Sequence, residues 1–428
     1  MQAWKPSPFV LLALMGVAGI GVFACGGGGG GGGGGGTPSC SDAIPRVVLA
    51  TPAQQRSKYG PNVIVPESSI VRAEDARLRA HTNFLIRMPS SAASTRAPDP
   101  SGFTPAQILK AYNLPTNGGS GAIAIVDAYN WPTALHDFNA FANEFGLPQE
   151  TSSDVTSSSN TVFQVVYANG IKPGDNNSWS QEMALDTEWA HAIAPNAKIY
   201  LVEASSSSPA ALAAAIKIAK VLPGVKQVSL SFGIAEDPCD FVLYDPALVQ
   251  SGVTFFAASG DDAGQRDFPG ESKNVIAVGG TALVLNVDNT WKSESVWDGT
   301  TCGPSSFEPR PSFQDVVASF VGSHRANCDI AAVGDPNTGV NVYDSFMSGL
   351  NPWQVFGGTS VSCPVIAAIA NVAGVNHSSS AKQNEAIYAG IGSANFHDIV
   401  SGSANGFDAK TGYDFPSGVG TPNGVAGF

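Results

Sequence analysis

Ser360 is a residue whose type and surroundings could do nucleophilic chemistry. It follows the small-residue turn Gly357-Gly358-Thr359 and precedes an apolar, helix-like segment, residues 365–372. Pro364 is expected in the first helical turn, where the N–H that proline lacks would be unpaired anyway. Ser360 would then lie at a helix N-terminus, which favours the negative charge that develops when a hydroxyl attacks a carbonyl. Taken alone, the stretch is more typical of a cap on a buried helix, so a nucleophile needs support from elsewhere.

Two carboxylates at helical spacing could do acid–base chemistry. Glu182 and Asp186 lie in SWSQEMALDTEWAHAIAP, residues 178–195, where Ser178 and Gln181 predict a capping box and a helix that begins there. At a spacing of four they share a helix face and repel by about 0.2–0.5 kcal/mol if both ionise in water. If they are buried, one pKa must rise. The apolar neighbours indicate burial, but a solvated acidic pair explains this window equally well.

A third carboxylate, Asp261, follows a predicted strand, residues 253–258, in the turn SGDDAG. An aspartate in such a turn is most often a turn former. The functional alternative is a donor to a developing oxyanion. A carboxyl group donates a hydrogen bond only when it is protonated, and low pH would allow that.

The elements that must position these residues read as an α/β fold. Buried strands are predicted at residues 121–126, 198–202, 225–232, 253–258 and 275–278, and helices at 105–112, 132–145 and 209–220. Buried strands interleaved with helices indicate a parallel sheet covered on both faces. Because ligands bind beyond the carboxyl ends of such strands, the loops after Val126, Phe232 and Ala258 are where a site is expected.

These stretches together resemble the sedolisin (serine-carboxyl) peptidases. Glu182-x-x-x-Asp186, SGDDAG and GGTSVSCP occur in that family's order and spacing, as do TPAQILKAYNLP, AIVDAYNWP, FPGESKNVIAVGGTAL and HDIVSG…AKTGYDFPSGVGTPNG. The resemblance covers about residues 103–428. It implies a subtilisin-like α/β fold, with a predominantly parallel central sheet and helices on both faces, in which a glutamate replaces the catalytic histidine.

The resemblance also implies roles, residue by residue. Ser360 would be the nucleophile of a serine-type endopeptidase and Glu182 its general base. Asp186 would hold Glu182 and share its proton, and Asp261 would be the oxyanion-hole acid. A coupled Glu–Asp pair and a protonated aspartic acid both require acid conditions, so an acid-active enzyme on protein or peptide substrates is expected.

One structural Ca²⁺ ion is expected from the same resemblance. Its ligands would be the carboxylates of Asp398 and Asp414 and the backbone carbonyls of Ile399, Lys410 and Gly412, an oxygen shell suited to a hard cation. The family often has glycine where this chain has Lys410.

The N-terminus reads as a targeting segment. Residues 1–24 have the basic and apolar regions of a signal peptide, and Cys25 precedes eleven glycines, Gly26–Gly36. We therefore expect export, as a secreted protein or as a bacterial envelope lipoprotein attached through a lipid on Cys25. Residues 25–45 are expected to form a flexible tether. Residues 46–102 look irregular and too short for the family's folded pro-domain, with one helix expected at Arg72–Arg87 and a linker at residues 89–100.

Composition excludes some partners. The 428 residues carry a net charge of −13 and no basic patch, which argues against nucleic acid. A monomer is expected.

Six cysteines are few for this length, and export permits disulfides. Cys302–Cys328 is the better candidate pair and Cys239–Cys363 the poorer one, with Cys40 free, although sequence cannot determine the pairing.

Three alternatives stay open. A subtilisin-type Ser-His-Asp protease would use Asp127, after the first strand, and His191, but His191 lacks the expected Gly-Thr context and reads as structural. A catalytically dead, tethered binding protein on the same fold would need none of this chemistry. A sugar-cleaving enzyme is the weakest alternative, because carboxyls on one helix face cannot flank a substrate from two sides.

Overall fold

The computed structural model describes residues 58–72, 75, 77–88, 98–99, 101–262, 265–346 and 351–428. The predicted signal peptide, the tether with Cys25, and Cys40 lie outside these ranges. Within them, no helix combines the length and the apolar character that crossing a membrane requires.

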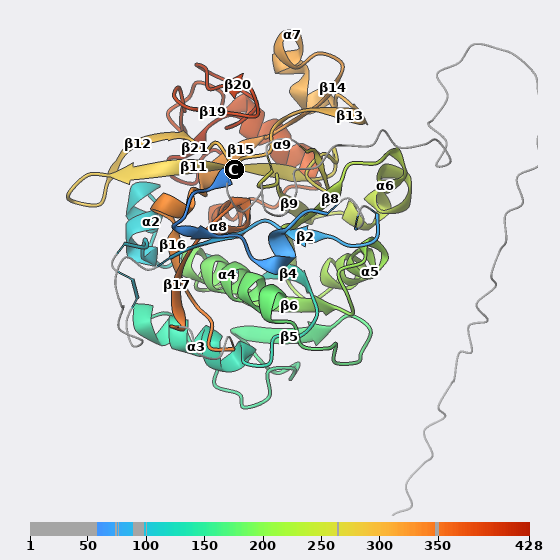
Figure 1. The fold of residues 1–428 in the computed structure, drawn as a ribbon, viewed down its shortest axis with the longest axis vertical. Helices are drawn as coiled ribbons and strands as arrows, with labels where there is room; N and C mark the ends of the chain where they lie inside the picture. The colour runs from blue at the N-terminus through green and yellow to red at the C-terminus, as the bar shows by residue number, and fades with distance from the viewer. Residues whose placement is uncertain are drawn as a thin grey trace, which may run out of the picture. The chain divides into compact units, whose positions relative to one another are not determined.

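A mainly parallel sheet of eight described strands runs through the fold, in the order β12-β11-β9-β7-β4-β6-β5, with β15 beside β11 (Figure 1). All neighbours are parallel except β11 and β12. The strands are β4 (Ala122–Ala128), β5 (Phe163–Tyr167), β6 (Lys198–Ala204), β7 (Val225–Leu230), β9 (Thr254–Ala258), β11 (Ile276–Leu285), β12 (Trp291–Val296) and β15 (Ile330–Val333). Every residue of β4 is buried, so the sheet is covered on both faces there. The predicted α/β class is confirmed.

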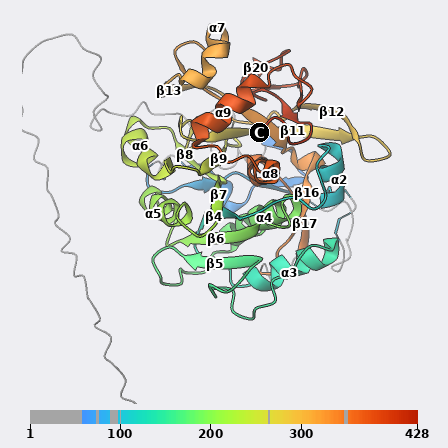
Figure 2. The same ribbon diagram turned by 180° about the vertical axis from the view of Figure 1, so that it is seen from behind.

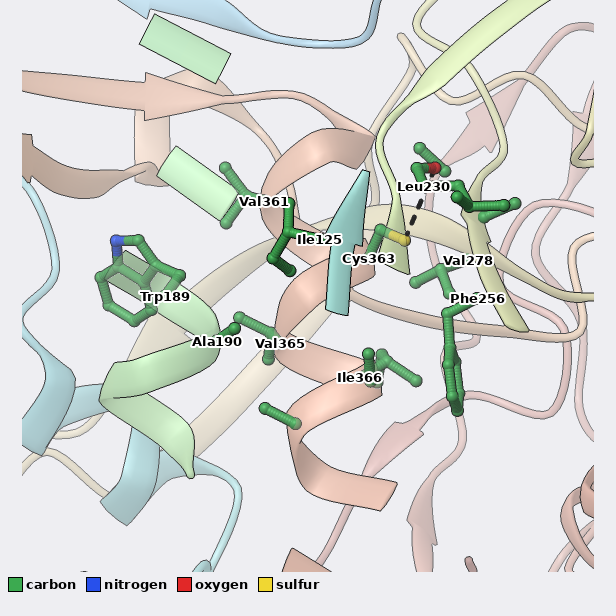
Figure 3. Packing of buried hydrophobic residues seen from close by; sticks show 14 of the residues in the cluster. Ile125, Trp189, Ala190, Leu230, Phe256, Val278, Val361, Cys363, Val365 and Ile366 are labelled. Carbon is green, nitrogen blue, oxygen red and sulfur yellow. Dashed lines mark hydrogen bonds between the residues drawn. The ribbon is translucent and has the colours of Figure 1, made fainter. Parts of the chain in front are cut away.

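Two long helices pack against each other and against this sheet. Helix α4 (Asn177–Ile193) lies over β4 and β6, and α8 (Thr359–Ala373) lies over β7, β9, β11 and β15. Figure 3 labels Val361, Val365 and Ile366 of α8 between Trp189 and Ala190 of α4 and Phe256 and Val278 of the strands. Close packing on both sides fixes the start of α8 relative to α4. The other helices are α2 (Pro105–Ala111), α3 (Ala134–Phe145), α5 (Pro209–Ala219), α6 (Pro238–Leu243), α7 (Ala318–Val321) and α9 (Ser380–Ala389).

Two predicted helix starts are wrong in detail. Asn176, not Ser178, caps α4, and its side chain accepts hydrogen bonds from the backbone of Ser178 and Trp179. Helix α8 begins at Thr359, so Pro364 lies inside the helix rather than in its first turn. Proline at that position leaves the carbonyl of Ser360 without its i+4 donor.

The described part of the segment predicted as a helix at Arg72–Arg87 contains two short strands and no α-helix. Strand β2 (His81–Thr82) pairs with β8 (Phe232–Ala235), and β3 (Leu85–Arg87) lies between β1 (Val63–Ile64) and β17 (Trp353–Gly357). We call the described residues 58–72, 75 and 77–88 the N-terminal clasp. Coloured blue, it crosses in front of α8 and α4 in Figure 1 and behind them in the reverse view of Figure 2. A separate small core holds it, made by Val63, Val65, Ile70, Leu85 and Trp297.

The predicted disulfides are not formed. Cys302, Cys328 and Cys363 are buried free thiols. Cys302 and Cys328 flank the antiparallel pairing of β13 (Gly303–Pro309) with β14 (His324–Asn327), but their thiols turn to different acceptors. The Cys302 thiol donates to the carbonyl of Ala404 at 3.4 Å, and the Cys328 thiol donates to that of Thr301 at 3.7 Å.

Candidate active site

Ser360 is the second residue of α8 and is fully buried. Its hydroxyl donates to the carbonyl of Ser231 at 3.2 Å and accepts from the backbone N–H of Asn83 at 3.1 Å. Its own backbone N–H donates to the carbonyl of Asn83 at 2.9 Å. The N–H and the hydroxyl of the predicted nucleophile therefore both contact the backbone of one residue of the N-terminal clasp, Asn83. This helix N-terminus is a site that stabilises negative charge on a carbonyl oxygen.

Glu182 and Asp186 lie on the face of α4 toward the sheet and α8, and both are completely buried. Burial is the main cause that raises both pKa values well above the ordinary range. Asp186 and Asp127 raise that of Glu182 further, while the nearby hydroxyl of Ser360 opposes the rise. By strict geometry, none of the four carboxyl oxygens has a hydrogen-bond partner among the described residues, so the contact between Glu182 and Ser360 is a loose one.

Asp127 is a further buried carboxyl beside Glu182 and Asp186. The sequence did not place it with them. It lies near the carboxyl end of β4, fully buried, and burial raises its pKa. The charge of Asp127 raises the pKa values of both Glu182 and Asp186. The signal was available, since its strand ends at the sheet edge where sites form. The sequence suggests Asp127 only as the partner of His191 in a subtilisin-type protease.

His191 is far from this chemistry, as its structural reading predicted. It lies nine residues beyond Glu182 on α4, which is about 13 Å along a helix axis. Its Nε2 is 2.8 Å from the carbonyl of Pro148, and its ring packs on Phe138. Burial lowers the pKa of His191 to about 4. The subtilisin-type alternative therefore lacks its base.

Asp261 is held against the start of α8. The backbone N–H and the hydroxyl of Thr359 donate to its Oδ1 at 2.8 and 2.9 Å. A Cβ placed on Gly358 would collide with both the free Oδ2 of Asp261 and the carbonyl oxygen of Asn83. These two oxygens therefore approach the same point, which only glycine leaves open. Burial raises the pKa of Asp261 to about 7, so in acid it is protonated and able to donate.

The four predicted residues are thus brought to one place. A buried hydroxyl at a helix N-terminus lies near two buried carboxyls, Glu182 and Asp186, whose pKa values are raised, and near Asp261, whose pKa is raised to about 7. These are the kinds of group that acyl transfer can use as a nucleophile, a base and a donor to the oxyanion.

The predicted calcium residues also lie together, in the loop that ends with Asp414. The Asp398 carboxylate accepts from the N–H of Gly412 at 3.1 Å, and Asp414 accepts from the N–H of Lys410 at 2.8 Å. Burial raises the pKa of Asp414 to about 6, and the charge of Asp398 adds to that rise. Two carboxylates that repel each other beside backbone carbonyls of the same loop are an oxygen set that can suit a hard cation. The described residues contain no group of three or more His, Cys, Asp or Glu side chains that could hold a metal, so carbonyls such as that of Ile399 would have to complete the shell.

A family model, two related proteins and a solved structure all relate this chain to the same kind of protein. A model described as "Subtilase family" matches residues 116–404. Kumamolisin from Bacillus sp. (strain MN-32) is 30% identical over 416 residues, which cover 85% of this chain and 70% of kumamolisin. Sedolisin from Pseudomonas sp. (strain 101) is 27% identical over 394 residues, covering 80% of this chain and 63% of sedolisin. The solved structure of Pseudomonas sedolisin (serine-carboxyl proteinase) with two molecules of pseudo-iodotyrostatin has the same fold. Its TM-score is 0.63 at 24% identity, over 76% of this chain and 96% of that one.

Proposed function

This chain belongs to the subtilase family and is a sedolisin-like serine endopeptidase, and on that premise we propose that it cleaves proteins or peptides in acid through an acyl-enzyme on Ser360. Glu182 is the general base in this proposal, and Asp186 positions it. Asp261 donates a hydrogen bond to the oxyanion.

In the first step, the Ser360 hydroxyl attacks the substrate carbonyl while its proton passes to Glu182. The N–H of Ser360 and the protonated carboxyl of Asp261 donate to the oxyanion that forms. Glu182 then passes the proton to the leaving amine. Water enters, Glu182 again serves as base, and the ester on Ser360 is hydrolysed.

The observation that carries the proposal is the burial of Glu182 and Asp186 beside Ser360. A single solvated carboxylate is too weak a base to serve a serine, but two buried carboxyls that hold one proton between them titrate at a raised apparent pKa. Asp261 must keep its proton in the same conditions. Asp261 meets this requirement on the acid side of its pKa of about 7.

We propose in addition that the loop of Asp398 and Asp414 binds one Ca²⁺ ion. The ion would neutralise the repulsion between these carboxylates and fix the loop. Its ligands would be the two carboxylates and the carbonyls of Ile399, Lys410 and Gly412.

Export, lipid attachment through Cys25 and a monomeric state remain sequence-based proposals. Metabolic labelling with a radioactive fatty acid tests the lipid, because replacing Cys25 with serine should abolish the label. Sedimentation of the purified chain tests the oligomeric state.

A pH–rate profile on a denatured protein substrate tests the function, with Ser360→Ala, Glu182→Gln and His191→Ala measured beside the wild type. We expect activity confined to acid, and a loss on the order of 10⁴-fold or more in the first two variants. His191→Ala should keep the shape of the profile. Activity near neutral pH that survives Glu182→Gln and disappears in His191→Ala would reverse the assignment of the base. A folded, calcium-loaded protein without activity at any pH would favour the binding-protein alternative.

A further inference from the structure

A second surface lies at the opposite ends of the elements that carry the active site. Strand β7 leads to Ser231, strand β9 leads to Asp261, and α8 begins at the turn of Ser360. The chain before β7 and β9 and the chain after α8 therefore lie about 20 Å from these residues, the length of a strand of five or six residues or a helix of four turns. We call this surface the rear face, and it consists of residues 217–226, 249–253 and 374–378.

Hydrogen bonds join the three segments of the rear face. The Nζ of Lys220 donates to the backbone carbonyls of Ala247 and Val249, both at 2.9 Å, and so ties the end of α5 to the chain before β9. The backbone N–H of Gly252 donates to the carbonyl of Ser378 at 3.0 Å, which ties the chain before β9 to the chain after α8. The segments therefore form one continuous surface.

Aliphatic side chains are exposed on this face. Val221, Val249 and Val375 are 63%, 56% and 47% exposed, and each comes from a different segment. Exposed apolar side chains that gather in one place mark a surface that binds something. The rear face contains no aromatic residue and no arginine, although these residues supply most of the binding energy between proteins. Its composition is therefore unlike the centre of a protein–protein interface.

The charge of the rear face is opposite to that of the whole chain. The net charge of the protein is −13, but residues 204–235 contain three lysines and no acidic residue. These lysines are Lys217, Lys220 and Lys226. The acidic residues that flank the other two segments in the sequence have partners elsewhere. Asp245 is buried and accepts a hydrogen bond from Ser272, and Glu385 pairs with Lys382 at 2.6 Å. The three lysines therefore give this face a positive potential.

Valines set among lysines suit the interface of a lipid bilayer. Aliphatic side chains enter the headgroup layer, while the flexible stems of lysines keep the ammonium groups at the phosphates. We propose that the rear face docks the enzyme on an anionic phospholipid membrane, with the active site directed away from the lipid. This inference does not depend on the proposed function. If Cys25 carries lipid, as proposed above, the rear face is the second contact that stable anchoring requires.

The test is co-sedimentation of the purified full chain with mixed phosphatidylglycerol and phosphatidylcholine vesicles. All variants also carry Cys25→Ser, so that no attached lipid takes part. Each lysine near an anionic surface strengthens binding about fivefold, so Lys217→Gln combined with Lys226→Gln should weaken it about 25-fold. The matched control is Lys172→Gln combined with Lys292→Gln. It removes two exposed charges outside the rear face and should bind like the wild type.

The contribution of the apolar side chains is tested with Val221→Ser combined with Val249→Ser, which should also weaken binding. Lys220 stays in place in every variant, because its Nζ holds the neighbouring segment. Binding of the wild type should fall as added salt screens the lysines, and pure phosphatidylcholine vesicles should not retain it.

Three results would overturn the inference. The first is a wild type that does not bind the anionic vesicles. The second is equal weakening by the two lysine pairs, or unchanged binding by the valine pair, because the rear face would then not enter the lipid. The third is a dimer of the wild type in sedimentation that the valine pair abolishes, which would show that a second copy of the chain covers this face.

Discussion

Replacing Asp261 with asparagine separates the hydrogen bond that this residue donates from the proton that it carries. Its Oδ1 accepts from the N–H and the hydroxyl of Thr359 at 2.8 and 2.9 Å, and the carbonyl oxygen of an asparagine can accept both. The amide NH₂ then takes the place of Oδ2, where the oxyanion forms. An amide donates at every pH, whereas a carboxyl donates only while protonated.

The size of the effect follows from the pKa of about 7 to which burial raises Asp261. One pH unit above that value about a tenth of the molecules keep the proton, and two units above it about a hundredth. The wild-type rate should therefore fall about tenfold per unit in mild alkali because of this group, and the rate of Asp261→Asn should not. Asp261→Ala removes the donor at every pH and should cost about 10²–10³-fold in kcat.

The assay is steady-state hydrolysis of one peptide by wild type, Asp261→Asn and Asp261→Ala from acid to mild alkali. The ratio of the asparagine variant to the wild type should rise through the alkaline range. A constant ratio would show that another group sets the alkaline limb. An asparagine variant as slow as the alanine variant in acid would show that Asp261 is not the donor.

Three further outcomes are expected. Burial lowers the pKa of His81, but Asp267, 3.5 Å from its Nε2, and Asp261 more than offset this, so the net direction is upward. A raised pKa stabilises the fold below the unfolded value and less as the pH rises through the folded one. Asp267→Asn should therefore lower the free energy of unfolding by about 1.5–3 kcal/mol in acid and by less in mild alkali, as denaturant titration measures. Gly374→Ala, at φ 70° with nothing closer than 4.0 Å, should cost about 1–2 kcal/mol, and Gly358→Ala distinctly more because its Cβ collides; equal costs would contradict the crowding. Chelation by EGTA should lower the melting temperature of the wild type but not of Asp414→Asn, and an unchanged wild type would argue against the ion.

Taken singly, the stretches around Ser360, Glu182–Asp186 and Asp261 are weak signals, and they predicted one site only when read together as a resemblance to the sedolisin peptidases. The apolar run after Ser360, the spacing of Glu182 and Asp186, and the strand before Asp261 are written in short stretches of sequence, and the parallel sheet brings the three stretches to one edge. The sequence also allowed His191 to be predicted as a structural residue and not a base, because its surroundings are typical of a buried helix end.

The N-terminal clasp could not be predicted because its structure depends on distant partners. Strand β2 has only two residues and pairs with residues about 150 positions away, and β3 pairs with residues about 270 positions away. Taken locally, residues 72–87 have a composition compatible with a helix, and tertiary pairing overrides that preference. The helix starts at Asn177 and Thr359 were missed by a few residues, which is common at helix ends.

Because the N-terminal clasp is part of the same chain, it acts on the active site as a tethered ligand rather than as a dissolved one. A short tether holds such a ligand at an effective concentration in the millimolar range. A free peptide at micromolar concentration would have to bind about a thousandfold more tightly to displace it. While the clasp stays in this place, the chain should thus show weak apparent affinity for every substrate alike.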